Sequence, residues 1–592
     1  MEFTITGHLT DATAAWDAIS DTDMINRVGG SSPMVDMSIE RDEHNYPKVM
    51  GVAGGPAGIK LPFEEDDNRW VQGRYFRQGR TYSAGPLLRS IWEGRLEQQG
   101  DGVIPSIWTQ MTPRSFVYTP IVAAVARRLN KRWQAYLDGL PPPGETSTEK
   151  LRTLEPYAQG SLDRWAKGAD PEIAERIGHL LVHERPLELQ RMSAFELADR
   201  WRLDRDAVLK AMVAGVGDGI FELYWSVKCP RCYAQTTSTG MLGDLADHAA
   251  CASCDVDFSP DLGDNVEVLF APHPSVAPRV EQTFCTLFPA SVPEIEASFI
   301  MAPGESIEER MDLRPGRWRI GAGSGIGDVG LEVSDSGDMA VEWKPGDRGG
   351  RDVKAGEVAL KLRNEKDGRV RVQVVRDDDL DQRVLASYLT TFPEFQRTLG
   401  DQVLAPDIRI ANRSVSLLFT DLTGSTAMYE KLGDAKAFAI VRDHFTILRR
   451  VTENHGGVIV KTIGDAIMAA FSDPVKTMAA ALEMVDALDD WVQESDFGVS
   501  IRLRVGFHVG PALMVHTDAA GIDYFGGTVN LAARTQGVAG GGDIVWTAQC
   551  HEIDSLRQQV DSRGLVTEAL DASLKGLAEN TRLYKVHIPI DG

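Results

Sequence analysis

The stretch VKTIGDAIMAAF, residues 460–471, predicts two buried strands joined by a tight turn that carries opposite charges. Apolar residues stand on both sides of the turn, which is typical of strands that are covered on both faces. Gly464 permits the left-handed backbone that a tight turn needs. Lys461 and Asp465 flank it, and charges beside apolar strands need partners or the edge of a cleft. Taken alone, the hairpin is also compatible with a solvated turn and a weak surface ion pair.

A second stretch, SVSLLFTDLTGSTAMYEKLG at residues 414–433, predicts a strand, a turn of small residues and a helix. The turn amides and the helix N-terminus favour an anion, beside the carboxylate of Asp421 at the end of the strand. Adjacent strand ends would bring Asp421 and Asp465 to one divalent-ion site, and their hard oxygen ligands favour magnesium or manganese. The predicted phosphate-binding residues of the turn are Leu422, Thr423, Gly424, Ser425 and Thr426.

A third stretch, GIDYFGGTVNLAART at residues 521–535, supplies further polar side chains. It places Asp523 in a loop, and it places Asn530 and Arg534 four residues apart, on one face of a predicted helix. Together these residues offer a carboxylate acceptor, an amide and a fixed cation. On its own, the Asn530 and Arg534 pair is equally typical of a solvated helix face.

With these motifs in order, residues 413–588 resemble the catalytic domain of class III nucleotidyl cyclases, and we predict a catalytic domain over residues 412–590. The resemblance covers about 30% of the chain. It implies a ferredoxin-like α/β fold that acts as a homodimer, with each active site built across the subunit interface. The motifs that carry it are FTDLTGST, KTIGDAIMAAF, LRVGFHVGP and DYFGGTVNLAAR.

The resemblance also implies roles for the hairpin and its neighbours. Asp421 and Asp465 would bind two Mg²⁺ or Mn²⁺ ions from one subunit, and Lys461 and Asp523 of the other subunit would recognise the base. Lys461 and Asp465 would then face opposite active sites. This interpretation explains why the hairpin carries both charges without a pair between them.

Further roles follow from the same resemblance. Asn530 would orient the ribose, and Arg534 would stabilise charge on the reacting phosphate. Arg504, in LRVG, and Lys575, in LKGL, match positions that often bind the triphosphate tail.

The base can be argued from hydrogen bonding. An adenine edge offers an acceptor at N1 and a donor at its amine, which match the Lys461 ammonium and the Asp523 carboxylate. Guanine reverses that pattern. We therefore predict an adenylate cyclase that converts ATP to 3′,5′-cyclic AMP and pyrophosphate, similar to soluble multidomain cyclases of bacteria.

Other functions stay open. The catalytic domain would be silent if it only bound nucleotide within a regulatory protein, and a cyclase for GTP or a pyrimidine nucleotide is a further alternative. A DNA-binding regulator is disfavoured, because the formal net charge of −24 and the pI near 5.0 oppose nucleic-acid and anionic-membrane partners.

The remaining composition favours a soluble, cytoplasmic protein of several domains. The chain has 592 residues, of which 43% are hydrophobic, so it can bury several cores. It has no apolar run of membrane-spanning length, and its N-terminus lacks a basic region and an apolar signal core.

Residues 1–140 are predicted to form a strand, two short helices, a meander of strands and a long helix. This order resembles the helix-grip fold of the START and polyketide-cyclase-like superfamily. Such domains enclose an apolar cavity, so a small apolar ligand is one interpretation and a purely structural module is the other.

Residues 155–226 are predicted to be helical, with the outline of a winged helix. The second helix of that outline carries few positive charges, so contact with protein is favoured over contact with DNA.

Four of the six cysteines form two CxxC pairs over residues 227–258. Two such pairs about eighteen residues apart predict a zinc ribbon with one structural Zn²⁺. A redox dithiol is the alternative for a single pair, and His248 is an alternative ligand. The predicted ligands are Cys229, Cys232, Cys251 and Cys254.

Strand patterns with Gly- and Asp-rich turns over residues 260–385 predict a β-sandwich-like regulatory domain. Its GAGSGIG segment lacks the Lys-Ser/Thr of a phosphate loop, so we interpret it as a turn. Residues 386–411 are predicted to be a linker with helical content. The expected fold class is therefore a multidomain α+β protein.

Overall fold

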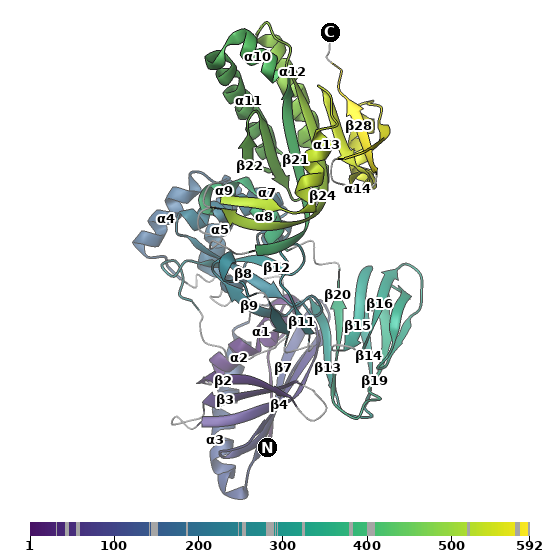
Figure 1. Ribbon diagram of the computed structural model, residues 1–592. Coiled ribbons are helices and arrows are strands. Elements are labelled where there is room, and N and C mark those ends of the chain that lie inside the picture. Colours follow the sequence, from purple (N-terminus) through teal and green to yellow (C-terminus); the bar gives the residue numbers. More distant parts are fainter. Residues whose placement is uncertain are drawn as a thin grey trace.

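The structure is a computed structural model, and Figure 1 shows a largely helical unit between the N-terminal domain and the C-terminal domain. No helix among the described residues is long and apolar enough to cross a membrane. The structure describes the whole chain except residues 31, 42–46, 55–59, 141, 144–151, 185–187, 247, 252–255, 280–288, 290, 291, 293, 323–325, 378–382, 400–408, 496, 518–520, 575–579 and 590–592.

The N-terminal domain is an antiparallel sheet packed against a long helix. Trp92 of the sheet stacks on Trp133 of the helix with ring centroids 5.6 Å apart. The element order is the one that the helix-grip prediction requires, and that assignment stays a prediction. The elements are β1 (Glu2–Thr6), α1 (Ala12–Ser20), α2 (Thr22–Gly29), β2 (Ser32–Arg41), β3 (Pro47–Gly54), β4 (Lys60–Val71), β5 (Tyr75–Tyr82), β6 (Leu87–Gln99), β7 (Gly102–Pro113) and α3 (Thr119–Asp138).

Charge is buried beside this aromatic core. Arg80 lies over the rings of Phe63 and Trp92, and its guanidinium is 3.5 Å from the carboxylate of Glu65. Both charged side chains are almost fully buried. The core of this domain therefore contains an ion pair as well as apolar side chains.

Residues 295–376 form two facing sheets around a core that contains Trp318 and Trp343. One of these sheets continues into the N-terminal domain, because β13 pairs with β4 through Ala297 opposite Val71. The two predicted modules therefore share one 12-stranded sheet. The strands are β13 (Ile295–Met301), β14 (Ser306–Leu313), β15 (Gly316–Ala322), β16 (Gly327–Ser334), β17 (Ala340–Trp343), β18 (Arg348–Lys354), β19 (Gly356–Arg363) and β20 (Val370–Arg376).

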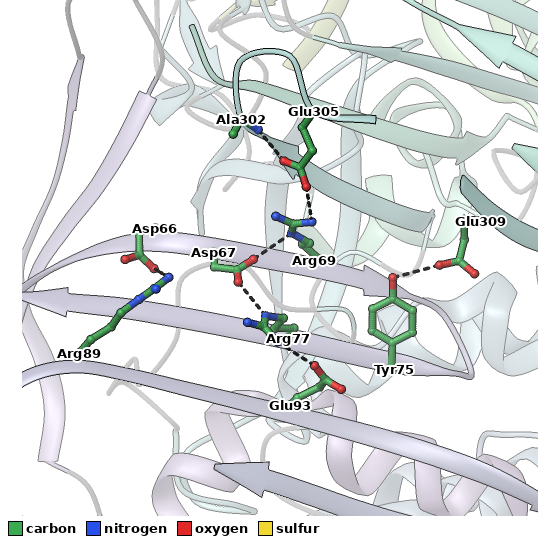
Figure 2. Close-up of polar contacts among 10 residues, drawn as sticks. All are labelled: Asp66, Asp67, Arg69, Tyr75, Arg77, Arg89, Glu93, Ala302, Glu305 and Glu309. Carbon is green, nitrogen blue, oxygen red and sulfur yellow. Dashed lines mark hydrogen bonds and ion pairs between the residues drawn. The ribbon is translucent and has the colours of Figure 1, made fainter. Parts of the chain in front are cut away.

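Polar contacts reinforce the junction between these two modules, as Figure 2 shows. Arg69 of β4 donates to Asp67 at 3.0 Å and to Glu305, beyond β13, at 2.9 Å. Tyr75 of β5 donates to Glu309 of β14 at 3.1 Å. The paired strands and these contacts make the first domain and the two facing sheets one connected body.

The helical unit has a core that includes two segments predicted elsewhere. Strand β12 pairs along its full length with β8, so it belongs here and not to the predicted sandwich of residues 260–385. The elements of the unit are α4 (Pro156–Ala166), α5 (Pro171–His183), α6 (Ala194–Trp201), α7 (Arg205–Gly217), β8 (Phe221–Lys228), β9 (Gln235–Thr239), β10 (Ala249–Cys251), β11 (Val256–Phe258), β12 (Val266–Pro272), α8 (Ala386–Thr390) and α9 (Pro393–Leu399).

Helices α8 and α9 correct the prediction of a linker over residues 386–411. Leu389 and Phe395 are fully buried, and the Phe395 ring meets Trp225 of β8 edge-on at 5.9 Å. Their apolar residues recur at helical spacing, so these helices bury their apolar side in the core of the unit. The rest of the predicted linker includes residues 400–408, which lie outside the described residues.

The C-terminal domain has an eight-stranded sheet in the order β22-β23-β21-β24-β26-β28-β27, with β25 paired to β24. Helices α11 and α12 cover one face of this sheet and α13 lies on the other. The elements are β21 (Arg409–Thr423), α10 (Ser425–Leu432), α11 (Asp434–Asn454), β22 (Val458–Ile463), β23 (Ala466–Phe471), α12 (Pro474–Glu494), β24 (Arg502–Thr517), β25 (Gly521–Phe525), α13 (Gly527–Gln536), β26 (Asp543–Thr547), α14 (Ala548–His551), α15 (Asp554–Ser562), β27 (Glu568–Ala572) and β28 (Thr581–His587).

Gly506 allows α13 to lie against the sheet. A Cβ at this position would come within 2.1 Å of the backbone nitrogen of Gln536. We predict that Gly506→Ala destabilises the protein by about 1–3 kcal/mol, because the helix must move away from β24. Calorimetric unfolding of the full chain measures the loss. Gly527→Ala, at a position with open space, is the control, and equal stability of both variants would contradict the close approach.

Burial of His508 predicts a pH-dependent stability. Its ring contacts the Thr547 hydroxyl at 2.8 Å, and burial lowers the pKa of His508 to about 4. The unfolded chain takes up this proton below about pH 6.5, so stability should fall as the pH drops from about 6.5 to 4. In urea unfolding, His508→Gln should lose about 2 kcal/mol less than the parent between pH 7 and 5. Identical losses would contradict the prediction.

Candidate functional site

The first carboxylate of the candidate site lies at the end of β21. Asp421 stands opposite Arg504 of β24 in the antiparallel register, and the Arg504 guanidinium contacts its carboxylate. Both side chains are partly exposed. The predicted phosphate-binding residue Arg504 therefore lies directly beside a predicted metal ligand.

The second carboxylate lies in the turn between β22 and β23. Gly464 has a φ of 66°, which is the left-handed backbone expected for this turn. Asp465 follows it, and the Ile467 amide donates to Thr420, the residue before Asp421, at 3.3 Å. The turn therefore brings Asp465 to the same end of the sheet as Asp421.

One oxygen of Asp465 is buried without a hydrogen-bond partner among the described residues. A buried carboxylate oxygen in that state is costly, and a bound cation would remove the cost. His444 of α11 lies close to Asp465, and burial lowers its pKa although the carboxylate opposes that shift. No signal in the sequence indicated His444.

The turn after Asp421 has the predicted form. Gly424 has a φ of 79°, and a Cβ there would lie 2.8 Å from the Ser500 carbonyl oxygen. Helix α10 begins at the next residue, so the turn amides and the first turn of the helix lie together. The Thr423 hydroxyl donates to the Arg502 carbonyl and accepts from its amide, so this side chain connects β21 to β24.

A partly buried ion pair forms the second part of the candidate site. Lys461 Nζ lies 2.9 and 2.7 Å from the two carboxylate oxygens of Asp523. Asp523 is 5% exposed and also accepts from the Tyr524 amide at 2.8 Å. The β21–β24 pair has a register shift between Asn412 and Val415, and such a bulge bends strands. Strand β25 then contacts β22.

Asn530 and Arg534 lie on α13, as predicted, but neither side chain has a hydrogen bond or ion pair in the described part of the chain. No described polar contact connects the Asp421 and Arg504 pair with the Lys461 and Asp523 pair. One chain therefore presents two separate groups of candidate site residues. Lys575 lies outside the described residues.

Apolar surface surrounds the Lys461 and Asp523 pair. Ile463 and Phe525 are about half exposed, and Lys461 lies 5.9 Å from the centre of the Phe525 ring. Exposed apolar side chains beside a polar site are typical of an interaction surface.

Three of the predicted zinc ligands lie together. The sulfur atoms of Cys229, Cys232 and Cys251 are within 4.8 Å of one another, and all three residues are buried. The 3.5 Å between the Cys232 and Cys251 sulfurs is far longer than a disulfide bond. The Arg231 amide donates to the Cys229 sulfur at 3.4 Å. Cys254 lies outside the described residues.

His248, the alternative ligand, is exposed and contacts Ser259 at 3.4 Å. The cluster is part of the core around Trp70 and Trp133 of the N-terminal domain. Arg231, between the first two cysteines, reaches Asp328 of β16. The cysteine cluster therefore lies where three parts of the structure meet.

Comparison with known families identifies two segments. Residues 410–587 match the family described as Adenylate and Guanylate cyclase catalytic domain. Residues 157–297 match a Family of unknown function (DUF5939), a segment that contains most of the helical unit and the cysteine pairs.

Similar curated proteins match a part of this chain. The receptor-type adenylate cyclase GRESAG 4.1 of Trypanosoma brucei brucei is 28% identical over 211 residues, which are 29% of this chain and 17% of that protein. An adenylate cyclase of Lachancea kluyveri is 33% identical over 185 residues, 27% of this chain and 10% of that protein. The chain thus spans less than a fifth of either relative.

Solved structures also match a part of this chain. A Trypanosoma brucei adenylate cyclase in its monomeric state is 25% identical, with a TM-score of 0.25, and the match covers 29% of this chain and 89% of that one. The adenylyl cyclase CyaB of P. aeruginosa is 21% identical, with a TM-score of 0.27, and covers 31% and 97%.

Proposed function

Residues 410–587 belong to the adenylate and guanylate cyclase catalytic domain family, and we propose that this protein is an adenylate cyclase that forms 3′,5′-cyclic AMP and pyrophosphate from ATP. The observation that carries the proposal is the pair of carboxylates, Asp421 and Asp465, at one end of the sheet, where one buried oxygen of Asp465 accepts no hydrogen bond from the residues that the structure describes. A decayed site would be expected to lack at least one of these carboxylates.

Asp421 and Asp465 would hold two Mg²⁺ or Mn²⁺ ions. The chemistry of the donors fits, because carboxylate oxygens are the ligands that these hard cations prefer. Arg504 contacts the Asp421 carboxylate in this structure and would turn to a phosphate of the bound nucleotide. When bound, such ions would supply positive charge that activates the attacking hydroxyl and stabilises the leaving group.

The Lys461 and Asp523 pair would select adenine. Lys461 and Asp523 form an ion pair with each other in this structure. A bound base would replace that contact with one hydrogen bond to each residue. The lysine ammonium would donate to adenine N1 and the carboxylate would accept from the exocyclic amine, whereas a guanine edge would meet two mismatches. Such mismatches leave buried polar groups unpaired, which is costly.

The remaining residues would align an intramolecular reaction. The ribose 3′-hydroxyl would lose its proton to water and attack the α-phosphate in line, so that the new O–P bond forms and the bond to pyrophosphate breaks. Asn530 would orient the ribose, and Arg534 would stabilise charge on the phosphate, a role worth about a thousandfold or more in related phosphoryl transfers. The turn amides of residues 422–426, Arg504 and Lys575 would bind the phosphates. No protein nucleophile is needed.

A homodimer with shared sites would unite the two groups of residues. The carboxylates of one subunit would face Lys461, Asp523, Asn530 and Arg534 of the other. Asn530 and Arg534 on α13 have no polar partner within the described ranges, and Ile463 and Phe525 are exposed. These features support this arrangement, because a partner subunit would cover them.

Shared sites predict complementation between two inactive variants. Asp465→Ala and Arg534→Ala should each lose at least about 99% of activity, since each removes charge that the transition state needs. After subunit exchange in equal parts, the mixture should regain about a quarter of the parent activity, because half of the dimers then hold one complete site. Heterodimers proven by mass spectrometry but still inactive would contradict shared sites.

A silent nucleotide-binding protein remains the alternative, and cyclases for other nucleotides are a second one. In a silent protein, the signal would be the binding of nucleotide to the C-terminal domain and not the formation of a product. Complementation separates the silent domain from the proposal, since a silent domain gives no activity to recover, and product formation from each nucleotide separates the other cyclases.

The cysteine cluster would hold one structural Zn²⁺, with Cys254 completing the four thiolates. The three clustered sulfurs and the amide hydrogen bond to Cys229 support this proposal. Four thiolates leave no open position on the metal, so the site would be structural.

Metal analysis of the full chain tests the zinc proposal. The purified protein should contain about one equivalent of zinc, and Cys229→Ser or Cys251→Ser should lose most of it, because each removes a thiolate ligand. Cys550→Ser is the matched control, since Cys550 is also fully buried but lies in the C-terminal domain, remote in sequence from the CxxC pairs. Protein that was expressed and purified with zinc supplied, but that contains less than about 0.2 equivalents of bound zinc, would contradict the site.

A further inference from the structure

The helical unit and the C-terminal domain share one continuous core. The sheet face under α13 contributes Phe419, Met514 and Tyr524, and helices α8 and α9 contribute Leu389 and Phe395 to the same cluster of buried residues. Figure 1 shows the β24–β25 arm over the region of α7 to α9. Strand β25, which carries Asp523, is therefore packed on the upstream helices and not only on its own domain.

A cluster of polar side chains also joins the helical unit to the C-terminal domain. Lys476 of α12 lies 3.0 Å from the carboxylate of Asp206 on α7 and 3.1 Å from the hydroxyl of Tyr388 on α8. The Tyr388 hydroxyl donates to Asp206. A second ion pair joins Arg397 of α9 to Glu453 of α11 at 3.1 Å. Both contacts cross from the helical unit to the catalytic domain.

Tyr524 connects this junction to the base-recognition pair. Its side chain is 1% exposed, and its hydroxyl lies close to the Thr390 hydroxyl of α8 without a hydrogen bond of good geometry. Its backbone amide donates to the Asp523 carboxylate. A shift of Tyr524 relative to α8 would therefore move the carboxylate that pairs with Lys461.

The packing at this contact is incomplete. A cavity of about 40 Å³ lies between Gln396 of α9 and the strands β22 and β25, lined by Val460, Ile522 and Tyr524 among others. A cavity of this size has room for at least one water molecule. The strands of the base-recognition pair therefore have room for a small displacement against α9.

From these contacts we infer that the helical unit positions the base-recognition pair, Lys461 and Asp523. Tyr524 is the positioning residue, and the cluster of Asp206, Tyr388 and Lys476 holds the helical unit against the catalytic domain. The inference rests on the proposed function, and it assigns the upstream helices a role in nucleotide affinity and base choice. A change in the helical unit is transmitted to Asp523 through α8 and Tyr524. No described polar contact joins this junction directly to Asp421 or Asp465.

Lys476→Met in the full-length dimer tests the inference. Hydrogen exchange of the Ile522–Phe525 amides should rise about tenfold, because the arm loses its fastening. The KM for ATP should rise about three- to tenfold while kcat changes less than about twofold, and discrimination against GTP should fall. Asp206→Lys combined with Lys476→Asp should restore part of each loss.

The matched control is Asp486→Asn on the same helix α12, which breaks an ion pair with Arg563 inside the catalytic domain. It should change none of these quantities. If Lys476→Met behaves like this control, the inference is overturned. If no nucleotide yields product from the parent protein, the proposed function fails, and the exchange measurement alone still decides whether the helical unit holds β25.

Discussion

The ion pair between Lys461 and Asp523 is the contact on which the proposed site depends. It joins β22 to β25, strands that are far apart in the sheet order, and it forms because the arm of β21 and β24 bends at its bulge. Lys461 pairs with Asp523 and not with Asp465 of its own hairpin, and no other described lysine pairs with Asp465. The hairpin therefore presents a carboxylate on one side and a donor on the other.

The bend would expose apolar side chains of β25, and the upstream helices cover them. A strand arm that leaves its own sheet exposes apolar residues, and here Ile522 and Tyr524 are buried against the upstream helices. Those helices contact the cysteine-bearing strands, which in turn pack on the N-terminal core. The N-terminal domain shares its sheet with residues 295–376. Displacements in the upstream body can thus reach the catalytic domain through packed elements.

The sequence predicted the local chemistry better than the assembly. The turn at Gly464 and the helix that carries Asn530 and Arg534 follow from short patterns, and the structure has both. That Lys461 would contact Asp523 within one chain did not follow from spacing, because the contact depends on a bulge far from both residues. It was the family resemblance that placed them together.

The predicted boundaries of the upstream regions differ from the structure where an element packs against a segment that is distant in the sequence. The short helices α8 and α9 resemble a linker because each has few residues, yet their apolar side chains fill the core of the helical unit. Strand β12 has the composition of a sandwich strand, but its partner β8 precedes it by some forty residues. Pairing and burial of this kind are set by tertiary contacts that a local pattern does not contain.

Product formation from ATP, GTP, CTP and UTP by the purified full-length protein, with magnesium or manganese, tests the central claim most directly. The account predicts cyclic AMP from ATP and little or no product from the other three nucleotides. No product from any of them, with the protein folded, dimeric and able to bind ATP, would contradict it and favour the nucleotide-binding alternative.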